Sequence, residues 1–178
     1  MRVGTAVAIG LLVCGCAVSR RAFVDVGACP GEGCQYGERW VAREAVRLRS
    51  APNSSASSTG MVQAGEAVQT LTGEVHTIPG RFVVRRPHGE FVPGDEVLVY
   101  TYLGEGVFRV RHNGTLKDAD LEFSPWGGSG GDRCQDESRC WGILKQQLQS
   151  EWWVRVRTGT GTDGWVLDAS KFLTPGNH

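Results

Sequence analysis

The stretch that decides the fold class is residues 96–121, EVLVYTYLGEGVFRVRHNGTLKDADL. Residues 96–103 are apolar on both faces, which is typical of a strand buried on both sides. Glycines flank Glu105, and Asn113-Gly114 is the strongest short signal for a two-residue hairpin turn. The stretch therefore predicts three consecutive strands joined by two tight turns, which is an antiparallel β-meander.

Short strands between turns are expected along the rest of the chain as well. Strand-like runs occupy residues 45–49, 81–86 and 152–157, and residues 51–60 form a loop by composition. Residues 141–149 fit a helix or a strand. The 25 glycines favour a turn-rich protein. Many short strands with frequent turns predict an all-β fold, either a small barrel or a sandwich.

Composition and charge exclude two classes of protein. The 40% of hydrophobic residues and 21% of charged residues are typical of a globular chain, not a disordered one. The 19 basic residues balance the 19 acidic residues, so the net charge is zero. A strongly basic nucleic-acid-binding protein is therefore excluded, and no nucleic-acid partner is expected.

The N-terminus has the pattern of an export signal. Arg2 precedes an apolar run at residues 3–13, which is too short for a transmembrane helix of about 20 residues. The run ends in VCGC at residues 13–16, which resembles the bacterial lipobox. This resemblance implies cleavage after Gly15 and lipid attachment at Cys16. The alternatives are an ordinary cleaved signal and an uncleaved anchor.

The lipobox resemblance also implies a location. We expect residues 1–15 to be a signal peptide and residues 16–38 to be a lipidated tether. Because one acyl chain anchors a protein only marginally, two or three chains such as palmitate would be needed for stable attachment. The protein is thus expected in the bacterial cell envelope, on the periplasmic side of the outer membrane, with the lipid as its contact with the membrane.

Four cysteines remain after the proposed processing: Cys29, Cys34, Cys134 and Cys140. An even number in an oxidising compartment indicates two disulfides, for which three connectivities exist. We favour the local pairs Cys29–Cys34 and Cys134–Cys140, since each closes a small loop. The alternative is a four-cysteine zinc site, but its ligands are usually two to four residues apart and no histidine is near. No metal or cofactor is expected.

Two segments carry a family resemblance. The first is VRLRSAP at residues 46–52, followed by GEAV at 65–68, and the second is WVRVR at 153–157, followed by GWV at 164–166. They resemble the opening strands and the closing hairpin of the bacterial Src-homology-3 (SH3) domain. The resemblance implies a small SH3-like barrel over residues 39–174.

One departure from the family pattern is large. The two halves of the family's domain are joined by a short hairpin, whereas residues 75–151 lie between them here. This β-rich insertion contains the meander and the second cysteine pair. It is either a lobe grown from the barrel, which we favour, or a second small barrel.

The paired tryptophans carry the candidate binding site. Because neighbouring strand residues point to opposite faces, Trp152 is expected in the core and Trp153 on the outer face. In the family, an outward tryptophan at this hairpin lines the peptide groove. The resemblance therefore implies the ligand-binding candidates Trp153, Arg155, Arg157, Pro52 and Asn53. The alternative is that the insertion covers Trp153.

The sequence indicates no catalytic residues. The four histidines lie in separate segments, and a Cys–His nucleophile needs a free thiol, whereas the cysteines are expected in disulfides. We expect a non-enzymatic, envelope-anchored binding module whose partner is a peptidoglycan peptide or an envelope protein. The alternatives are a disulfide-stabilised inhibitor or regulator of a secreted hydrolase, and an accessory structural subunit of an envelope complex.

Overall fold

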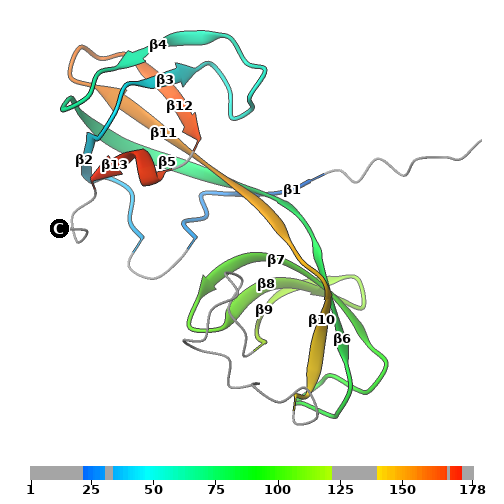
Figure 1. The fold of residues 1–178 in the computed structure, drawn as a ribbon. Coiled ribbons are helices and arrows are strands. Elements are labelled where there is room, and N and C mark those ends of the chain that lie inside the picture. The colour runs from blue at the N-terminus through cyan, green and yellow to red at the C-terminus, as the bar shows by residue number, and fades with distance from the viewer. Residues whose placement is uncertain (1–21, 31–33, 122–139, 168, 174–178) are drawn as a thin grey trace, which may run out of the picture.

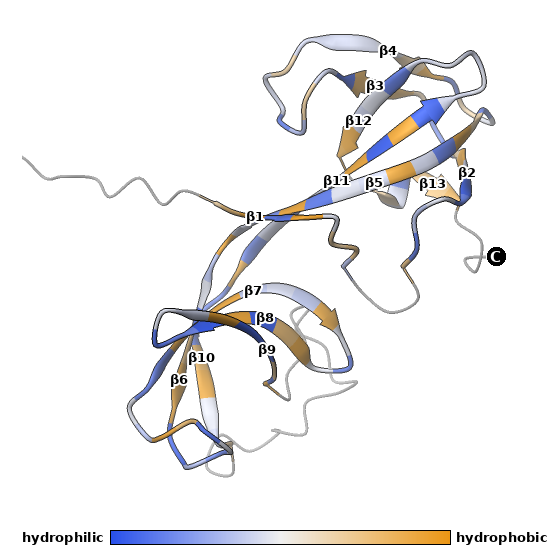
Figure 2. Ribbon diagram, turned by 180° about the vertical axis from the view of Figure 1, so that it is seen from behind, coloured by the Kyte–Doolittle hydropathy of each residue, from blue (hydrophilic) through white to orange (hydrophobic). Residues whose placement is uncertain are grey.

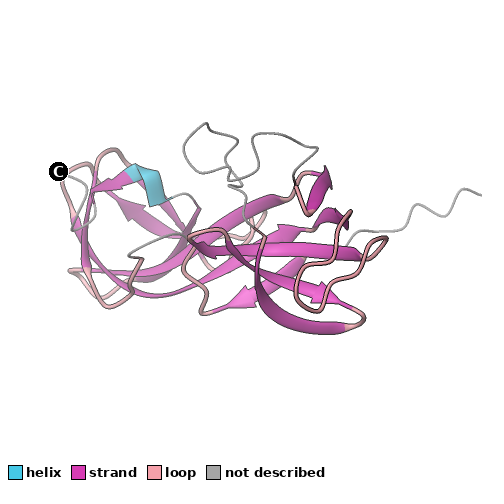
Figure 3. Cartoon of the chain, turned by 90° about the horizontal axis from the view of Figure 1, so that it is seen from below, coloured by secondary structure: helices cyan, strands magenta, loops and turns pink. Residues whose placement is uncertain are grey.

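The computed structural model describes residues 22–30, 34–121, 140–167 and 169–173. These residues form antiparallel strands and one short 3-10 turn, η1 (Ala169–Lys171), so the all-β prediction is confirmed. Figure 1 shows the strands arranged in two lobes, and Figure 3 shows that strands make up most of both.

Lobe A is a curled sheet that forms a half-barrel. Its strands, in chain order, are β2 (Arg39–Ala42), β3 (Val46–Arg49), β4 (Ser58–Val62), β5 (Ala67–Ile78), β11 (Gln149–Thr158), β12 (Asp163–Leu167) and β13 (Phe172–Leu173). They lie side by side in the order β13-β2-β5-β11-β12-β3-β4. Alternate residues point inward, and Trp40 lies at the centre of the core, 5.8 Å from the ring of Phe172.

Lobe B is built from the inserted residues and has its own sheet and core. Its strands are β6 (Gly80–Val84), β7 (Glu96–Gly104), β8 (Val107–His112), β9 (Thr115–Asp120) and β10 (Gly142–Gln146), in the order β10-β6-β7-β8-β9. The core gathers Phe82, Phe91, Phe108, Trp141 and several valines. Residues 141–149, which fit a helix or a strand by sequence, contain strand β10.

The meander turns form as the sequence predicts. Glu105 and Gly106 have φ angles of 51° and 87°, and Asn113 and Gly114 have φ angles of 49° and 79°. Two successive positive φ values are the requirement of the type I′ turn, whose twist matches that of the flanking strands. The three-strand meander over residues 96–121 is therefore confirmed.

The prediction that residues 96–103 are buried on both faces is wrong at Leu98, which is 36% exposed. The outer face of β7 is covered where β1 (Phe23–Val26) crosses it, because the ring of Phe23 lies 4.3 Å from that of Tyr100. Tyr100 is accordingly buried, and Leu98, farther along the same strand, is not.

The two lobes are connected by the far ends of β5 and β11. These strands form ten residue pairs, from Ile78 opposite Gln149 to Val68 opposite Thr158. A register shift at Arg155/Val156 bends the pair as it leaves lobe A. We call residues 73–78 and 149–154 the ribbon. Figure 2 shows apolar and polar residues mixed along both of its strands.

Strand β1 lies within residues 16–38, the segment expected to be a lipidated tether. It pairs with the ribbon from Phe23 opposite Thr77 to Val26 opposite Glu74. Asp25 also approaches lobe B, with 3.6 Å between its Oδ1 and Nη1 of Arg109. Strand β1 is only four residues long, and its partner β5 lies far away in the sequence, so no local pattern predicts it.

The first predicted disulfide is confirmed. Cys29 and Cys34 are bonded, with their Cα atoms 5.5 Å apart, so neither thiol is available as a zinc ligand. Cys134 and Cys16 lie outside the described residues, so the second bridge and the lipid attachment stay predictions. Among the residues that the structure describes, no helix is long and apolar enough to cross a membrane.

Candidate functional site

The two adjacent tryptophans point to opposite faces of β11, as the strand period requires. Trp152 packs against the core of lobe A, and its ring lies edge-on to that of Trp40 at 5.9 Å. Trp153 lies on the other face, between Glu74 of β5 and Leu167 of β12. The assignment of the two faces is confirmed.

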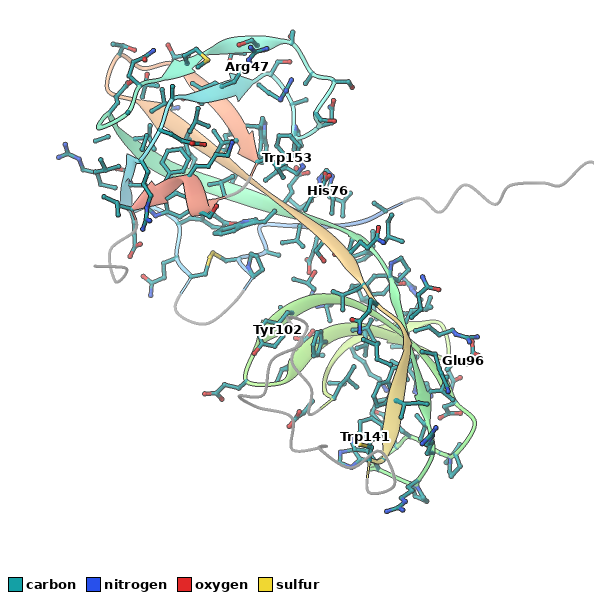
Figure 4. The ribbon with its side chains drawn as sticks, viewed as in Figure 1. Arg47, His76, Glu96, Tyr102, Trp141 and Trp153 are labelled. Atoms are coloured by element: carbon teal, nitrogen blue, oxygen red, sulfur yellow. A yellow bond between two sulfur atoms is a disulfide. The ribbon has the colours of Figure 1, made fainter. Side chains whose placement is uncertain are left out.

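Of the two alternatives for Trp153, an open groove wall and a covered side chain, the structure shows the covered one, because the side chain is only 1% exposed. Its Nε1 donates a hydrogen bond to Oε2 of Glu151 at 3.2 Å, and neighbouring strands flank it on both sides. Trp153 belongs to neither hydrophobic core. Figure 4 shows Trp153 near His76. An indole buried in this way cannot serve as the open wall of a groove.

The two arginines predicted beside Trp153 are held by one carboxylate. Arg157 donates two hydrogen bonds to Asp163, at 2.6 and 2.9 Å, and Arg155 donates one at 3.1 Å. The hydrogen bond from Arg157 lowers the pKa of Asp163. Both guanidinium groups therefore stabilise the β11–β12 hairpin, although their side chains stay half exposed.

The predicted loop residues form a local turn. Asn53 accepts a hydrogen bond at Oδ1 from Ser55 and donates its backbone N–H to Ala51, and Pro52 is half-buried. No hydrogen bond or ring contact among the described residues joins this loop to Trp153. The structure thus keeps Pro52, Asn53, Arg155 and Arg157 in lobe A but does not assemble them around an open indole.

A pocket of about 570 Å³ lies where the two lobes meet, and we call it the junction pocket. Its apolar walls are Val75, Trp152, Leu167 and Ala169 from lobe A and the ribbon, with Tyr102 and Leu148 from the side of lobe B. The volume lies within the range of small-ligand sites, roughly 300–1,000 Å³. A largely apolar concavity of this size is the natural candidate for a binding site.

Trp152 is a rigid wall of the junction pocket. Its Nε1 donates to Oη of Tyr36 at 3.0 Å, and that hydroxyl donates to the carbonyl of Ala28 at 2.5 Å. Burial raises the pKa of Tyr36, and the bond from Trp152 opposes the rise. Gly73 leaves the space for this hydroxyl, because a Cβ there would collide with Tyr36 Oη.

Tyr102 is aimed at the pocket by an irregularity in β7. The β7–β8 register shifts between Val99 and Tyr102, and such bulges redirect side chains. The ring of Tyr102 rests 5.1 Å from that of Phe108 and so is supported by the core of lobe B. Figure 4 shows Tyr102 on the part of lobe B that lies towards lobe A.

Polar groups are few around the junction pocket. The hydroxyl of Ser150 forms a hydrogen bond with that of Thr77 at 3.0 Å, so these two hydroxyls have each other as partners. Among the described residues that line the pocket, Glu151 is the one that carries a charge, and its carboxylate accepts the hydrogen bond from Trp153 on the face of β11 opposite Trp152. The pocket can therefore hold an apolar group.

A second polar cluster lies inside lobe B, in a different place from the pocket. Nε2 of His112 is 2.8 Å from Asp95 Oδ2, and Nδ1 is 3.3 Å from Nζ of Lys117. The backbone N–H of Val92, with a smaller contribution from His112, lowers the pKa of Asp95. These contacts fasten the loop before β7 to strands β8 and β9. In the described part of the chain, no group of three acidic, histidine or cysteine side chains could hold a metal ion.

The sequence did not reveal the junction pocket. Tyr102, Leu148 and Trp152 come together only after the β5–β11 pair has placed lobe B against the ribbon. The available signal was Trp152, the first tryptophan of the pair, which the strand period assigns to the core.

Comparison with known proteins adds no relative: no family model, no curated protein and no solved structure matches this chain.

Proposed function

We propose that this chain is an exported, lipid-anchored, non-enzymatic binding module of the bacterial SH3 type, and that the junction pocket is its ligand site. The observation that carries the proposal is the pocket itself, about 570 Å³ in volume, apolar, and walled by Trp152 and Tyr102. Rigid aromatic walls provide a large contact area at a low cost in conformational entropy. Anchoring through Cys16 follows from the lipobox resemblance.

The proposed ligand is a peptide segment of the cell wall or of an envelope protein. A pocket between two lobes can accept one side chain while the flanking peptide lies across the rim. Ser150, Glu151 and Ser170 are the polar residues that line the pocket, and polar groups orient a bound peptide.

Sedimentation with purified peptidoglycan tests this proposal on the detergent-solubilised full chain. Leu148→Ala removes a pocket wall, and Leu98→Ala, on the outer face of β7, is the matched control. We expect co-sedimentation that falls at least severalfold in Leu148→Ala and is retained in Leu98→Ala. Thermal melting of both variants separates a lost contact from a lost fold.

Equal binding by the two leucine variants would overturn the assignment of the site. Failure of the protein to bind either peptidoglycan or envelope proteins would overturn the binding function. Inhibition of added wall hydrolases by the intact protein would favour a regulator of those enzymes instead.

A further inference from the structure

We propose that the outer face of lobe A is a second interaction surface, which binds an extended acidic segment of a protein partner. By outer face we mean the side chains that point away from the core of lobe A, on its strands outside the ribbon. This surface is additional to the junction pocket. The proposal is carried by the arginines that surround Trp165 on this face.

Positive charge is concentrated on the outer face. Buried and outward residues alternate along the strands of lobe A, and the buried ones form its core. The strands outside the ribbon contain one acidic residue, Asp163, whereas every basic residue on them points outward. These basic residues are Arg39, Arg47, Arg49, Arg155 and Arg157. Because the whole chain has a net charge of zero, the face is positive through segregation of charge.

One row of the outer face crosses four strands. Arg39 of β2 lies opposite Gln69 of β5, which in turn lies opposite Arg157 of β11. Arg157 lies opposite Asp163 of β12. The first three residues line a hollow of about 260 Å³. The hollow therefore offers an anionic group a guanidinium on either side of Gln69.

Trp165 lies at the centre of the neighbouring row. Arg155 of β11 and Arg49 of β3 are its partners in register on either side. Trp165 is half-buried, and no aromatic ring of the described residues contacts it. Met61 of β4 is 44% exposed and lies opposite Arg47, which Figure 4 labels on lobe A. Tryptophan, arginine and methionine are the residue types enriched in protein interfaces, and the first two most often provide the binding energy.

Asp163 shows how this face holds a carboxylate. It accepts hydrogen bonds from Arg157 at 2.6 and 2.9 Å and from Arg155 at 3.1 Å. The guanidinium groups of Arg39 and Arg47, in contrast, have no hydrogen bond or ion pair within the part of the chain that the structure describes. The planar guanidinium matches the two oxygens of a carboxylate. The unpaired arginines therefore suit carboxylates that a partner supplies.

The spacing of the arginines matches that of an extended peptide. Arg47 and Arg49 are two residues apart on β3, as are Arg155 and Arg157 on β11. Residues two apart in a strand lie on one face, about 7 Å from each other. Acidic residues at every second position of an extended peptide have the same spacing. Such a segment can therefore pair several carboxylates with the outer face at once.

Three acetylated hexapeptide amides test the surface on the detergent-solubilised full chain. The first alternates glutamate with threonine, the second has glutamine in place of each glutamate, and the third has its glutamates consecutive. Binding is measured by calorimetry and by the NMR shift of the Trp165 indole N–H, which Trp165→Phe assigns. An exposed ion pair contributes up to about 1 kcal/mol, so we expect the alternating acidic peptide to bind about fivefold more tightly than the glutamine peptide. Its affinity should fall as salt is added.

Arg39→Gln and Arg47→Gln are the decisive variants, because neither substitution leaves a carboxylate without its partner. Arg43→Gln is the matched control, since Arg43 is exposed in the turn between β2 and β3 and is not on the outer face. We expect each decisive variant to bind the alternating acidic peptide about two- to fivefold more weakly, and Arg43→Gln to bind it as the unmodified protein does. Thermal melting checks that all three variants are folded.

The outcomes distinguish this face from other sources of attraction. Equal binding of the glutamate and glutamine peptides would overturn the proposal, and so would an equal loss of binding in Arg43→Gln. Equal binding of the alternating and consecutive glutamate peptides would overturn the extended conformation of the segment. Tighter binding of dihexanoyl phosphatidylglycerol, below its micelle concentration, would assign the face to an anionic lipid and overturn the protein partner. Leu148→Ala, in the junction pocket, should leave all of these results unchanged.

Discussion

Lobes A and B are both antiparallel sheets with a compact core, but they are assembled from the chain in different ways. Lobe B uses one continuous stretch, and its strands β7, β8 and β9 follow each other through two-residue turns. Lobe A combines two distant stretches, so that Thr77 and Ser150, which share a hydrogen bond, are 73 residues apart. Local pairing therefore dominates lobe B, and long-range pairing dominates lobe A.

This difference decides how far each lobe depends on the other. Closing a long loop costs chain entropy before any long-range contact forms, and lobe B is the loop that β5 and β11 must close. A folded lobe B holds the ends of these strands together. We therefore expect the stability of lobe A to depend more on the ribbon than the stability of lobe B depends on lobe A.

The largest expected effect is that of Phe108→Ala in the core of lobe B. Phe108 is 0% exposed, and removal of a buried phenylalanine side chain costs about 3–5 kcal/mol. Hydrogen exchange should show loss of protection in β7–β9, with a smaller loss in β3 and β12. Leu116→Ala, on the exposed face of β9, is the control. Equal loss of protection in both lobes would show that they unfold as one unit.

The next effect is that of Gly73→Val in the ribbon. A Cβ at this position would collide with Oη of Tyr36 and lie 2.9 Å from the carbonyl oxygen of Trp153, so overpacking should cost about 1–3 kcal/mol. Thermal unfolding measures the loss, and the indole N–H shift of Trp152 reports the displaced tyrosine. Gly159→Val is the control, because nothing lies within 4 Å of its Cβ position. If the two variants unfold at the same temperature, the close approach at Gly73 does not contribute to stability.

A smaller effect is expected from Phe23→Ala in β1. Its ring lies 4.3 Å from that of Tyr100 at a tilt of 33°, and an aromatic pair contributes about 0.5–1.5 kcal/mol beyond the area that it buries. The amides of β1 should exchange faster, because this strand has only four pairs with β5. Val24→Ala, one residue along on the opposite face and 42% exposed, should change exchange much less. Unchanged exchange in Phe23→Ala would mean that pairing with β5 is enough to hold β1.

The smallest effect concerns acid stability, and it compares one carboxylate from each lobe. Arg157 lowers the pKa of Asp163 in lobe A, and the Val92 N–H lowers that of Asp95 in lobe B. A carboxyl whose pKa is lower in the folded state stabilises the protein above its unfolded pKa, and this contribution is lost as the pH falls through the folded value. Stability should therefore fall below about pH 4.

Asp163→Asn and Asp95→Asn should each reduce the loss of stability at low pH. Denaturant unfolding between pH 2 and 7 measures this loss. Glu44→Gln, an exposed glutamate that pairs with Lys171 at 3.3 Å, is the control. If the free energy of unfolding of either aspartate variant depends on pH as steeply as that of the unmodified protein, that carboxylate does not contribute to acid stability.

How much the sequence could predict follows the same division. The meander, its Asn113-Gly114 turn and the Cys29–Cys34 bridge depend on residues close together in the chain, and all three are confirmed. The opposite faces of Trp152 and Trp153 follow from strand period alone. Each of these features is local, so local patterns were enough.

The failures concern contacts between distant segments. Trp153 is buried because β5 and β12 bring Glu74 and Leu167 against it, and no periodicity in β11 contains that information. Strand β1 exists because the ribbon offers it an edge. The junction pocket needs Tyr102 and Trp152 from opposite sides of the insertion.

The outermost rung of the ribbon has a consequence for chain connectivity. Ile78 and Gln149 are direct partners, so the chain leaves lobe A and returns to it through one position of a ladder. To the rest of lobe A, everything between these two residues is equivalent to a hairpin turn. Lobe B is thus an insertion between two paired strands of lobe A, and its length and content can change without altering the order of the strands in lobe A.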